Sequence, residues 1–412
     1  MPFMENILGQ TRAIDVLQAS LQTGRLHHAY IFHGPKGVGK FTTAREFAKA
    51  LLCKEPMQDL AGRVAACGNC ESCKAMVPVK PVETADAKKR AAKKKKSDEE
   101  DEDDEPETEI RDSFDRESHP DYHVIRKELA AMSSISELRK RKQMNIPIDL
   151  LRELMIGGKT SDGAYHDGIA FKSPRLNHNK VFIIDEAELL DNTGQNALLK
   201  TLEEPSPGTF IILVTSSEDR LLATIRSRCQ RVTFTALPEN IVAEWVAKKN
   251  LGLTEHHAQW LARFAAGSLG RVELALEYDL YSWAKAVLPA VNQMREDRYS
   301  TLLGPLIADL INSFAERWVE EHPSGSKDAA NKQAASLMWT MITQYARQKI
   351  TETAARCSAE DPIAAEAALE PWMRVIEAVA DAEQNLRSNV NMGLVCDALV
   401  AAMHRSLAPV GV

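Results

Sequence analysis

The chain has 412 residues, 44% of them hydrophobic, which is enough for about two to four domains with sizeable cores. Its net charge of −7 excludes a polycation wrapped on nucleic acid, so any such contact must come from local patches. No apolar run is long enough to span a bilayer and no signal-peptide segment is present, so we expect a cytoplasmic protein without a membrane partner.

The first predicted elements are a helix, a strand and a glycine-rich loop. Residues 5–26 carry an apolar stripe at helical spacing, and residues 29–32 form a short apolar run. The loop from Gly34 to Lys40 follows, and residues 42–52 have helical composition. Glycines let backbone N–H groups turn toward phosphates, a lysine adds positive charge, and a helix N-terminus adds its dipole. The pattern therefore predicts a phosphate-binding loop.

One position departs from the phosphate-loop pattern. Phe41 stands where Ser or Thr would supply the hydroxyl that binds Mg²⁺. Thr42 comes one residue late, and one residue along a helix turns the side chain by about 100°. The loop therefore favours nucleotide binding without efficient hydrolysis. The alternative is a glycine-rich turn that binds no nucleotide.

Four of the seven cysteines lie close together after this helix: Cys53, Cys67, Cys70 and Cys73. In a reducing compartment four thiolates favour a closed, tetrahedral, structural zinc site over disulfides. A redox dithiol is the alternative, but it would leave two of the cysteines unexplained. The other three, Cys229, Cys357 and Cys396, are expected to be ordinary buried thiols.

Residues 80–118 form a charged insertion with seven basic residues in 88–96 and ten acidic residues in 98–109. Because almost nothing there is apolar, we expect a disordered, solvated segment, with contact to nucleic acid as the weaker alternative. Structure resumes with a predicted strand over 119–125, a helix over 127–142 with a basic end, and a helix over 146–155.

Residues 180–231 predict a βαβ unit of a parallel sheet. An apolar strand over 181–184 ends on Asp185 and Glu186, and a helix capped near Asp191 ends at Pro205. A second strand over 210–214 then ends on Thr215. An acidic pair at such a strand end can hold Mg²⁺ and orient a water molecule.

The rest of the chain is predicted to be a strand over 232–234 followed almost entirely by helices. Residues 239–280 divide into three helical stretches, and residues 282–404 carry apolar stripes but no recognisable catalytic motif. The stripes are expected to form core, with some surface left for partner subunits.

This order of motifs resembles the AAA+ subunits of bacterial clamp loaders, in particular the delta-prime type of DNA polymerase III. The resemblance covers residues 5–280 apart from the insertion. The rest of the chain resembles the family only in being helical. It rests on residues 28–32, the four-cysteine cluster, and the runs Asn196–Pro205 and Ser227–Cys229.

The resemblance implies an α/β P-loop AAA+ domain with a parallel sheet and a zinc-binding module, a small helical lid, and a C-terminal all-α collar. The AAA+ domain would span residues 1–235, with the zinc module at 53–73. The lid would span residues 236–281 and the collar residues 282–412.

The resemblance also implies roles for individual residues. Those that would bind the nucleotide are Ile7, Gly9, Gln10, Gly34, Pro35, Gly37, Val38, Gly39, Lys40 and Thr42, the first three at the adenine. Asp185 and Glu186 would form the second acidic motif, and Thr215 and Arg271 would be the two sensors. Arg228 would be an arginine finger that reaches a nucleotide held by the neighbouring subunit in trans, and a surface salt bridge is the alternative for it.

The function implied is that of a stator in a five-subunit ring with gamma/tau-type and delta-type subunits, which opens the sliding clamp and loads it onto primed DNA. Its own ATPase activity would be weak or absent because of Phe41. An ATP-hydrolysing gamma/tau-type motor is the first alternative, disfavoured by Phe41. A zinc-containing nucleic-acid-binding AAA+ ATPase outside replication is the second, disfavoured by the Ser227–Cys229 run.

Overall fold

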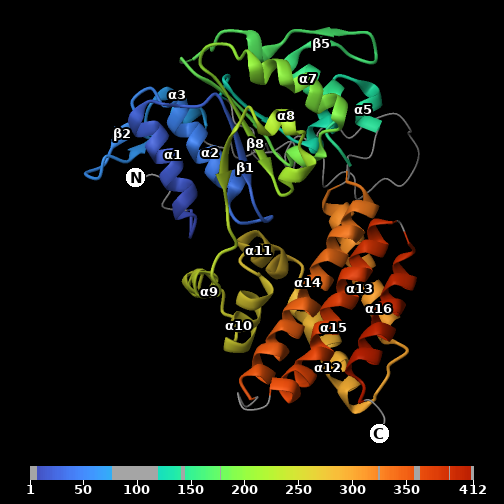
Figure 1. Ribbon diagram of the computed structural model, residues 1–412. Helices are drawn as coiled ribbons and strands as arrows, with labels where there is room; N and C mark the ends of the chain where they lie inside the picture. Colours follow the sequence, from blue (N-terminus) through green and yellow to red (C-terminus); the bar gives the residue numbers. More distant parts are fainter. Residues whose placement is uncertain are drawn as a thin grey trace, which may run out of the picture. The chain divides into compact units, whose positions relative to one another are not determined.

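The computed structural model describes residues 7–76, 119–140, 144–176, 178–322, 325–356, 362–388 and 390–409. The predicted insertion at 80–118 and Cys357 lie outside the described residues. The chain divides into two compact units, one of residues 1–34 and 40–234, the other of residues 35–39 and 235–412. Figure 1 labels many of the helices and strands.

The first unit is built on a five-stranded parallel sheet in the order β4-β7-β8-β1-β9. Its strands are β1 (Ala29–His33), β4 (Tyr122–Ile125), β7 (Lys180–Ile184), β8 (Thr209–Thr215) and β9 (Gln230–Thr233). Every residue of β7 and β8 is buried, as expected for apolar strands covered on both faces. The predicted parallel sheet is therefore confirmed.

The register of the sheet brings the ends of its strands together. Ile125 of β4 lies beside Ile184 of β7, Ile184 lies beside Leu213 of β8, and Thr215 lies beside His33 of β1. Because the strands are parallel, the residues that follow them meet at one edge, where α/β proteins commonly bind ligands.

The helices of the first unit are α1 (Thr11–Thr23), α2 (Lys40–Leu52), α3 (Glu71–Ala75), α5 (Ser136–Lys140), α6 (Ile148–Leu151), α7 (Asn192–Glu203) and α8 (Ala223–Arg226). Helix α7 begins as predicted, because Asp191 Oδ1 accepts a hydrogen bond of 2.6 Å from Gly194 N. Two small hairpins join β2 (Met57–Gln58) to β3 (Val64–Ala65) and β5 (Gly158–Lys159) to β6 (Tyr165–His166).

The helix predicted over residues 127–142, of which 141 and 142 lie outside the described residues, is wrong in its middle. A 3₁₀ helix, η2 (Lys127–Met132), ends before two serines, and α5 begins after them. Ser133 Oγ accepts a hydrogen bond from Ile135 N, and Ser134 N donates to Glu153 Oε1 at 2.7 Å. These side-chain bonds replace the helical ones and so break the helix.

Other predicted boundaries also shift. The strand expected from 119 begins at Tyr122, β9 covers 230–233 rather than 232–234, and the helix expected over 5–26 is confined to α1. The helix expected over 146–155 is α6 followed by a π-helical turn, η3 (Arg152–Ile156). Short 3₁₀ turns complete the unit: η4 (Ile169–Phe171), η5 (Ala187–Leu189) and η6 (Glu218–Arg220).

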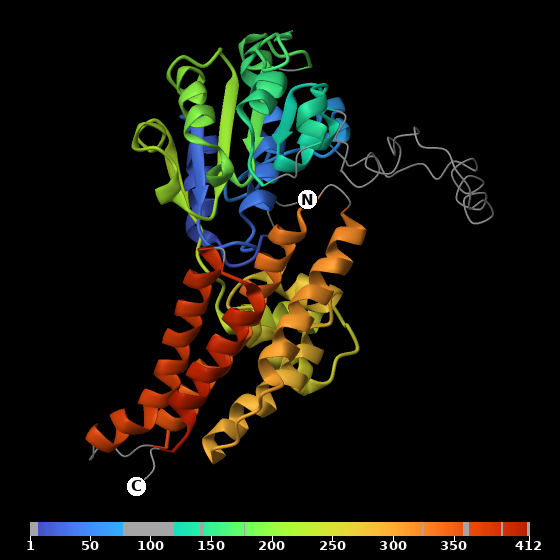
Figure 2. The ribbon, with the colours of Figure 1, turned by 90° about the vertical axis from the view of Figure 1, so that its right-hand side faces the viewer.

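The second unit is helical, as predicted from about residue 239 onward. It contains α9 (Glu239–Lys248), α10 (Glu255–Phe264), α11 (Leu269–Glu277), α12 (Leu280–Gln293), η7 (Met294–Glu296), α13 (Leu303–Glu321), α14 (Lys327–Ala354), α15 (Pro362–Arg387) and α16 (Met392–Leu407). Helices α13 to α16 pack side by side (Figure 2), and one hydrophobic cluster runs from Leu237 to Leu407. Across the described part of the chain, no helix combines the length and hydropathy that crossing a membrane requires.

Candidate functional site

Three glycines of the predicted phosphate loop adopt positive φ angles. Gly34, Gly37 and Gly39 have φ angles of 144°, 76° and 99°, which side chains with a Cβ rarely adopt. Lys40, at the start of α2, is almost completely buried, and its Nζ donates a hydrogen bond of 2.6 Å to Gly34 O. The lysine at the end of the loop therefore bonds to the carbonyl of the glycine that begins it.

Two of these glycines also permit close packing. A Cβ on Gly34 would lie 2.1 Å from Phe234 O, and a Cβ on Gly37 would lie 2.3 Å from Ser268 Oγ. Gly37 O accepts a hydrogen bond of 3.1 Å from Gly270 N, near the start of α11. Within the second unit the loop is therefore anchored to the helix that carries Arg271.

Phe41 contacts a cation rather than offering a metal ligand. The Cζ of Arg126 lies 4.1 Å from the centroid of the Phe41 ring. Arg126 Nε lies 3.3 Å from Asp185 Oδ2, so one guanidinium joins the first residues of α2 to the end of β7. Thr42, the late hydroxyl, is exposed.

Each member of the predicted acidic pair faces a basic side chain. Asp185 pairs with Arg126, and Lys127 Nζ lies 2.5 Å from Glu186 Oε2. Burial raises the pKa of Asp185, although Arg126 acts to lower it. Burial acts to lower the pKa of Lys127, but its attraction to Glu186 outweighs this and raises it. Each of the two acids thus has a basic side chain of the same unit beside it, and Glu128 also lies 3.9 Å from Lys127 Nζ.

Sequence reasoning missed Arg126 and Lys127. They follow strand β4 directly, just as Asp185 and Glu186 follow β7, and the register aligns the two strand ends. The sequence does show a basic pair after one predicted strand and an acidic pair after another. It becomes informative only when the two strands are known to be neighbours.

The two predicted sensor residues are held within their own units. Thr215 ends β8, is almost completely buried, and accepts a hydrogen bond of 3.1 Å from Ser217 N through Oγ1. Arg271 donates through Nη1 to Ala265 O at 2.7 Å, and burial lowers its pKa.

The residues expected at the adenine lie around the start of α1. Ile7 and Gln10 are buried, and Gly9 has a φ of 66°. Gln10 occupies the N-cap position, and its carbonyl accepts a hydrogen bond of 3.0 Å from Ile14 N. Their role in binding adenine stays a prediction, as do the roles of Pro35 and Val38.

Arg228 is a partly exposed residue just after α8. Its Nη2 lies 2.6 Å from Glu203 Oε1 at the end of α7, and its Nη1 donates to Thr224 O at 2.9 Å. The alternative expected for Arg228, a salt bridge within the unit, is thus present. An ion pair of this exposure typically contributes less than about 1 kcal/mol, so it leaves the guanidinium able to exchange partners.

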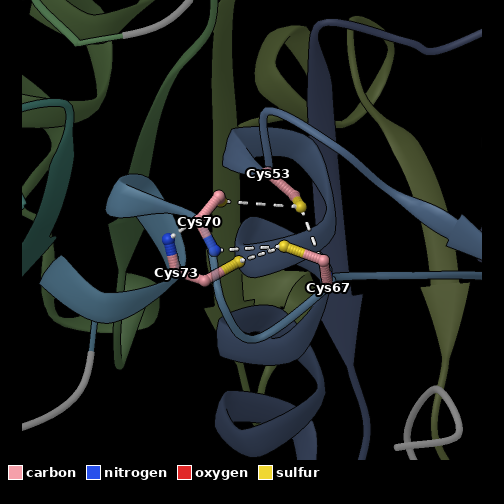
Figure 3. A group of neighbouring side chains, drawn as sticks. All are labelled: Cys53, Cys67, Cys70 and Cys73. Atoms are coloured by element: carbon pink, nitrogen blue, oxygen red, sulfur yellow. Dashed lines mark hydrogen bonds between the residues drawn. The ribbon is translucent and has the colours of Figure 1, made fainter.

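The four clustered cysteines converge (Figure 3). The sulfur atoms of Cys53, Cys67, Cys70 and Cys73 all lie within 4.8 Å of one another, with two pairs at 3.9 Å. A tetrahedral zinc site with Zn–S bonds of 2.3 Å needs sulfur atoms about 3.8 Å apart. The cluster can therefore hold a metal ion with four thiolate ligands.

Backbone N–H groups donate hydrogen bonds to three of these sulfur atoms. Cys67 N donates to Cys53 Sγ, Cys70 N to Cys67 Sγ, and Cys73 N to Cys70 Sγ, at 3.2 to 3.4 Å. Burial acts to raise the pKa of Cys70, but backbone donors from Cys73 and Lys54 lower it to about 6. Burial raises the pKa of Cys53 and of Cys73, which also belong to the cluster. It likewise raises the pKa of Cys229 and of Cys396, outside the cluster, to about 12.

Comparison with known proteins decides the family. The model of the family described as DNA polymerase III, delta subunit, matches residues 9–94 and 80–238, more than half of the chain. The chain belongs to the DNA polymerase III delta-subunit family. The resemblance drawn from the sequence is therefore confirmed.

The relatives of this delta-family chain include proteins named subunit delta′ and proteins named subunit tau/gamma. The DNA polymerase III subunit delta′ of Pseudomonas aeruginosa is 27% identical over 221 residues, which are 54% of this chain and 47% of the relative. The subunit tau/gamma of Haemophilus influenzae is 28% identical over 268 residues, 64% of this chain and 29% of the relative. The chain thus spans less than half the length of either relative.

Among solved structures, a DNA polymerase III gamma subunit-related protein of Thermotoga maritima aligns with 96% of this delta-family chain and 99% of its own. Its identity is 14% and its TM-score 0.40.

The phosphate loop gives a testable prediction about stability. Gly34→Ala should destabilise the protein more than Gly39→Ala. Both replace a glycine of positive φ, which costs about 1 to 3 kcal/mol for other residues. Only at Gly34 would the new Cβ also clash with a backbone oxygen, whereas at Gly39 nothing lies within 4 Å. Urea unfolding of both variants measures the difference, and equal losses of stability would contradict the close packing.

Proposed function

We propose that this chain is a delta-prime-type subunit of the DNA polymerase III clamp loader and helps to load the sliding clamp onto primed DNA. It would act as a stator in a five-subunit ring with gamma/tau-type and delta-type subunits. The match to the delta-subunit family and the delta′ name of a relative support this proposal. The structural observation that most supports the stator role is the position of Arg228.

Arg228 is suited to act outside its own unit. It follows a short helix near the C-terminus of α7, and its side chain is 36% exposed. Glu203 and Thr224 hold the guanidinium through two contacts, which limits its orientations without burying it. A rigid fork held at the surface can stabilise charge on a phosphate presented by a neighbouring subunit.

The chain's own site supports a stator rather than a motor. Its phosphate loop keeps Lys40 but has Phe41 in place of the hydroxyl that binds the metal. Asp185 and Glu186 each pair with a basic side chain, so neither is poised to orient an attacking water molecule. We therefore expect little or no ATP hydrolysis by the isolated chain.

The cysteine cluster is proposed to hold a structural zinc ion. Four converging sulfur atoms and the N–H donors around them suit this ion, and four protein ligands leave no position open for catalysis. The cluster follows α2, so the metal would stabilise the end of the helix that begins at the phosphate loop.

Arg228→Ala should sharply reduce ATP turnover in a reconstituted clamp loader while ring assembly persists. An arginine supplied in trans contributes roughly 10³ to 10⁵-fold in well-studied nucleotidases. Arg228→Lys should restore little, because a point charge does not reproduce the fork. Arg231→Ala is the matched control, since Arg231 is also a surface arginine in an ion pair, with Glu218. Normal turnover in assembled Arg228→Ala complexes would show that the arginine only forms a local salt bridge.

Metal analysis should find one zinc ion per chain in reduced protein. Cys70→Ser should lower the zinc content and the melting temperature, because metal-binding energy is also folding energy at a structural site. Cys229→Ser is the control, since this thiol lies outside the cluster and should leave the zinc content unchanged. Metal-free protein with the same melting temperature as the zinc-loaded protein would refute the proposal.

A further inference from the structure

The two residues expected to flank a magnesium ion at a phosphate loop both contact the same arginine. In phosphate-loop nucleotidases the ion is held by the hydroxyl after the loop lysine and by an aspartate at the end of a strand. Here those positions are Phe41 and Asp185, and Arg126 contacts both, at 4.1 Å from the ring centroid and 3.3 Å from Oδ2. We propose that the guanidinium of Arg126 replaces magnesium, so that this site binds nucleotide polyphosphate without a divalent cation.

Strand pairing in the sheet, rather than a loop, fixes the position of the Arg126 backbone. Ile125 lies beside Ile184 in the parallel ladder, and the ladder continues one step further, where Asp185 N donates to Ile125 O at 3.0 Å. Arg126 itself is extended, with φ −135° and ψ 155°. The backbones of the arginine and the aspartate are therefore fixed relative to each other by strand pairing.

The residues present fit a magnesium ion poorly. Magnesium requires nearly octahedral oxygen coordination at about 2.0–2.1 Å, and the ring of Phe41 offers no oxygen. Asp185 already faces Arg126, and Glu186 already faces Lys127 at 2.5 Å. A divalent cation would have to displace both basic side chains or lie beside them against charge repulsion.

The same group offers a polyphosphate anion a cationic donor, the guanidinium of Arg126. Arg126, Lys127 and Lys40 contribute three positive charges, which balance the three negative ones of Asp185, Glu186 and Glu128, whose Oε1 lies 3.9 Å from Lys127 Nζ. A guanidinium is also a forked donor that matches phosphate oxygens. The guanidinium thus supplies a positive charge beside Asp185, where a metal ion would otherwise bring it.

This inference concerns the chain's own site and goes beyond the stator role, which depends on Arg228 and a neighbour's nucleotide. Either can fail while the other holds. Loss of turnover in Arg228→Ala complexes says nothing about magnesium at Arg126, and magnesium binding by the isolated chain says nothing about action in trans.

The test is the binding of a fluorescent ATP analogue to the purified full chain, with excess magnesium or with a chelator. The wild type should bind with the same affinity, within about twofold, under both conditions. Phe41→Thr alone should behave likewise, because Arg126 still occupies the place of the metal. The double variant Phe41→Thr with Arg126→Ala should bind about tenfold more tightly with magnesium than with chelator, because it regains an oxygen ligand and loses the competing cation.

Manganese provides a second readout that does not require nucleotide turnover. Electron paramagnetic resonance should detect nucleotide-dependent manganese binding in the double variant and not in the wild type. Arg126→Lys combined with Phe41→Thr is the matched control and should remain independent of the metal, since it keeps the positive charge. Should Arg126→Ala unfold the protein, Arg126→Gln replaces it, with the same expectation.

Three results would overturn the inference. One is magnesium-dependent binding in the wild type or in Phe41→Thr alone. Another is a folded double variant that shows no magnesium dependence. The third is a wild-type chain that binds no nucleotide under either condition.

Discussion

The parallel register of β4, β7, β8 and β1 is the constraint on which the rest of the site depends. It places Arg126 beside Asp185 at one strand end, and Thr215 beside His33, just before the phosphate loop, at another. The chain segments that supply these residues lie far apart in sequence, and only the sheet makes them neighbours. A shift of one residue in the β4–β7 pairing would separate both basic side chains from their acidic partners.

The proposed nucleotide site combines the backbone of a phosphate loop with an unusual arrangement of charges. The glycine backbone, Lys40 and the acidic pair are all present, and each of the two acids has a basic side chain beside it. Nucleotide binding and ATP hydrolysis can be separated in such a site. Binding of the phosphates requires positive charge, whereas hydrolysis also requires a positioned water molecule. A subunit with the proposed stator role would have no need to hydrolyse ATP itself.

Sequence reasoning succeeded where the signal is local and failed where it depends on tertiary contacts. The glycine loop, the cap at Asp191 and the cysteine spacing are local patterns, and the structure contains the corresponding loop, helix start and cluster. The break at Ser133 and Ser134 depends on Glu153, 19 residues beyond Ser134, and so could not be seen in a helical pattern. Arg126 became meaningful only through the neighbouring strand, and the partner of Arg228 only through the packing of α7 near α8.

The most direct test of the stator account is ATP turnover by the purified chain, alone and after assembly with gamma/tau-type and delta-type subunits. The account predicts no turnover above trace for the chain alone, and turnover in the assembled complex that depends on the chain being present. Steady ATP hydrolysis by the isolated chain would contradict it and would favour the gamma/tau-type motor.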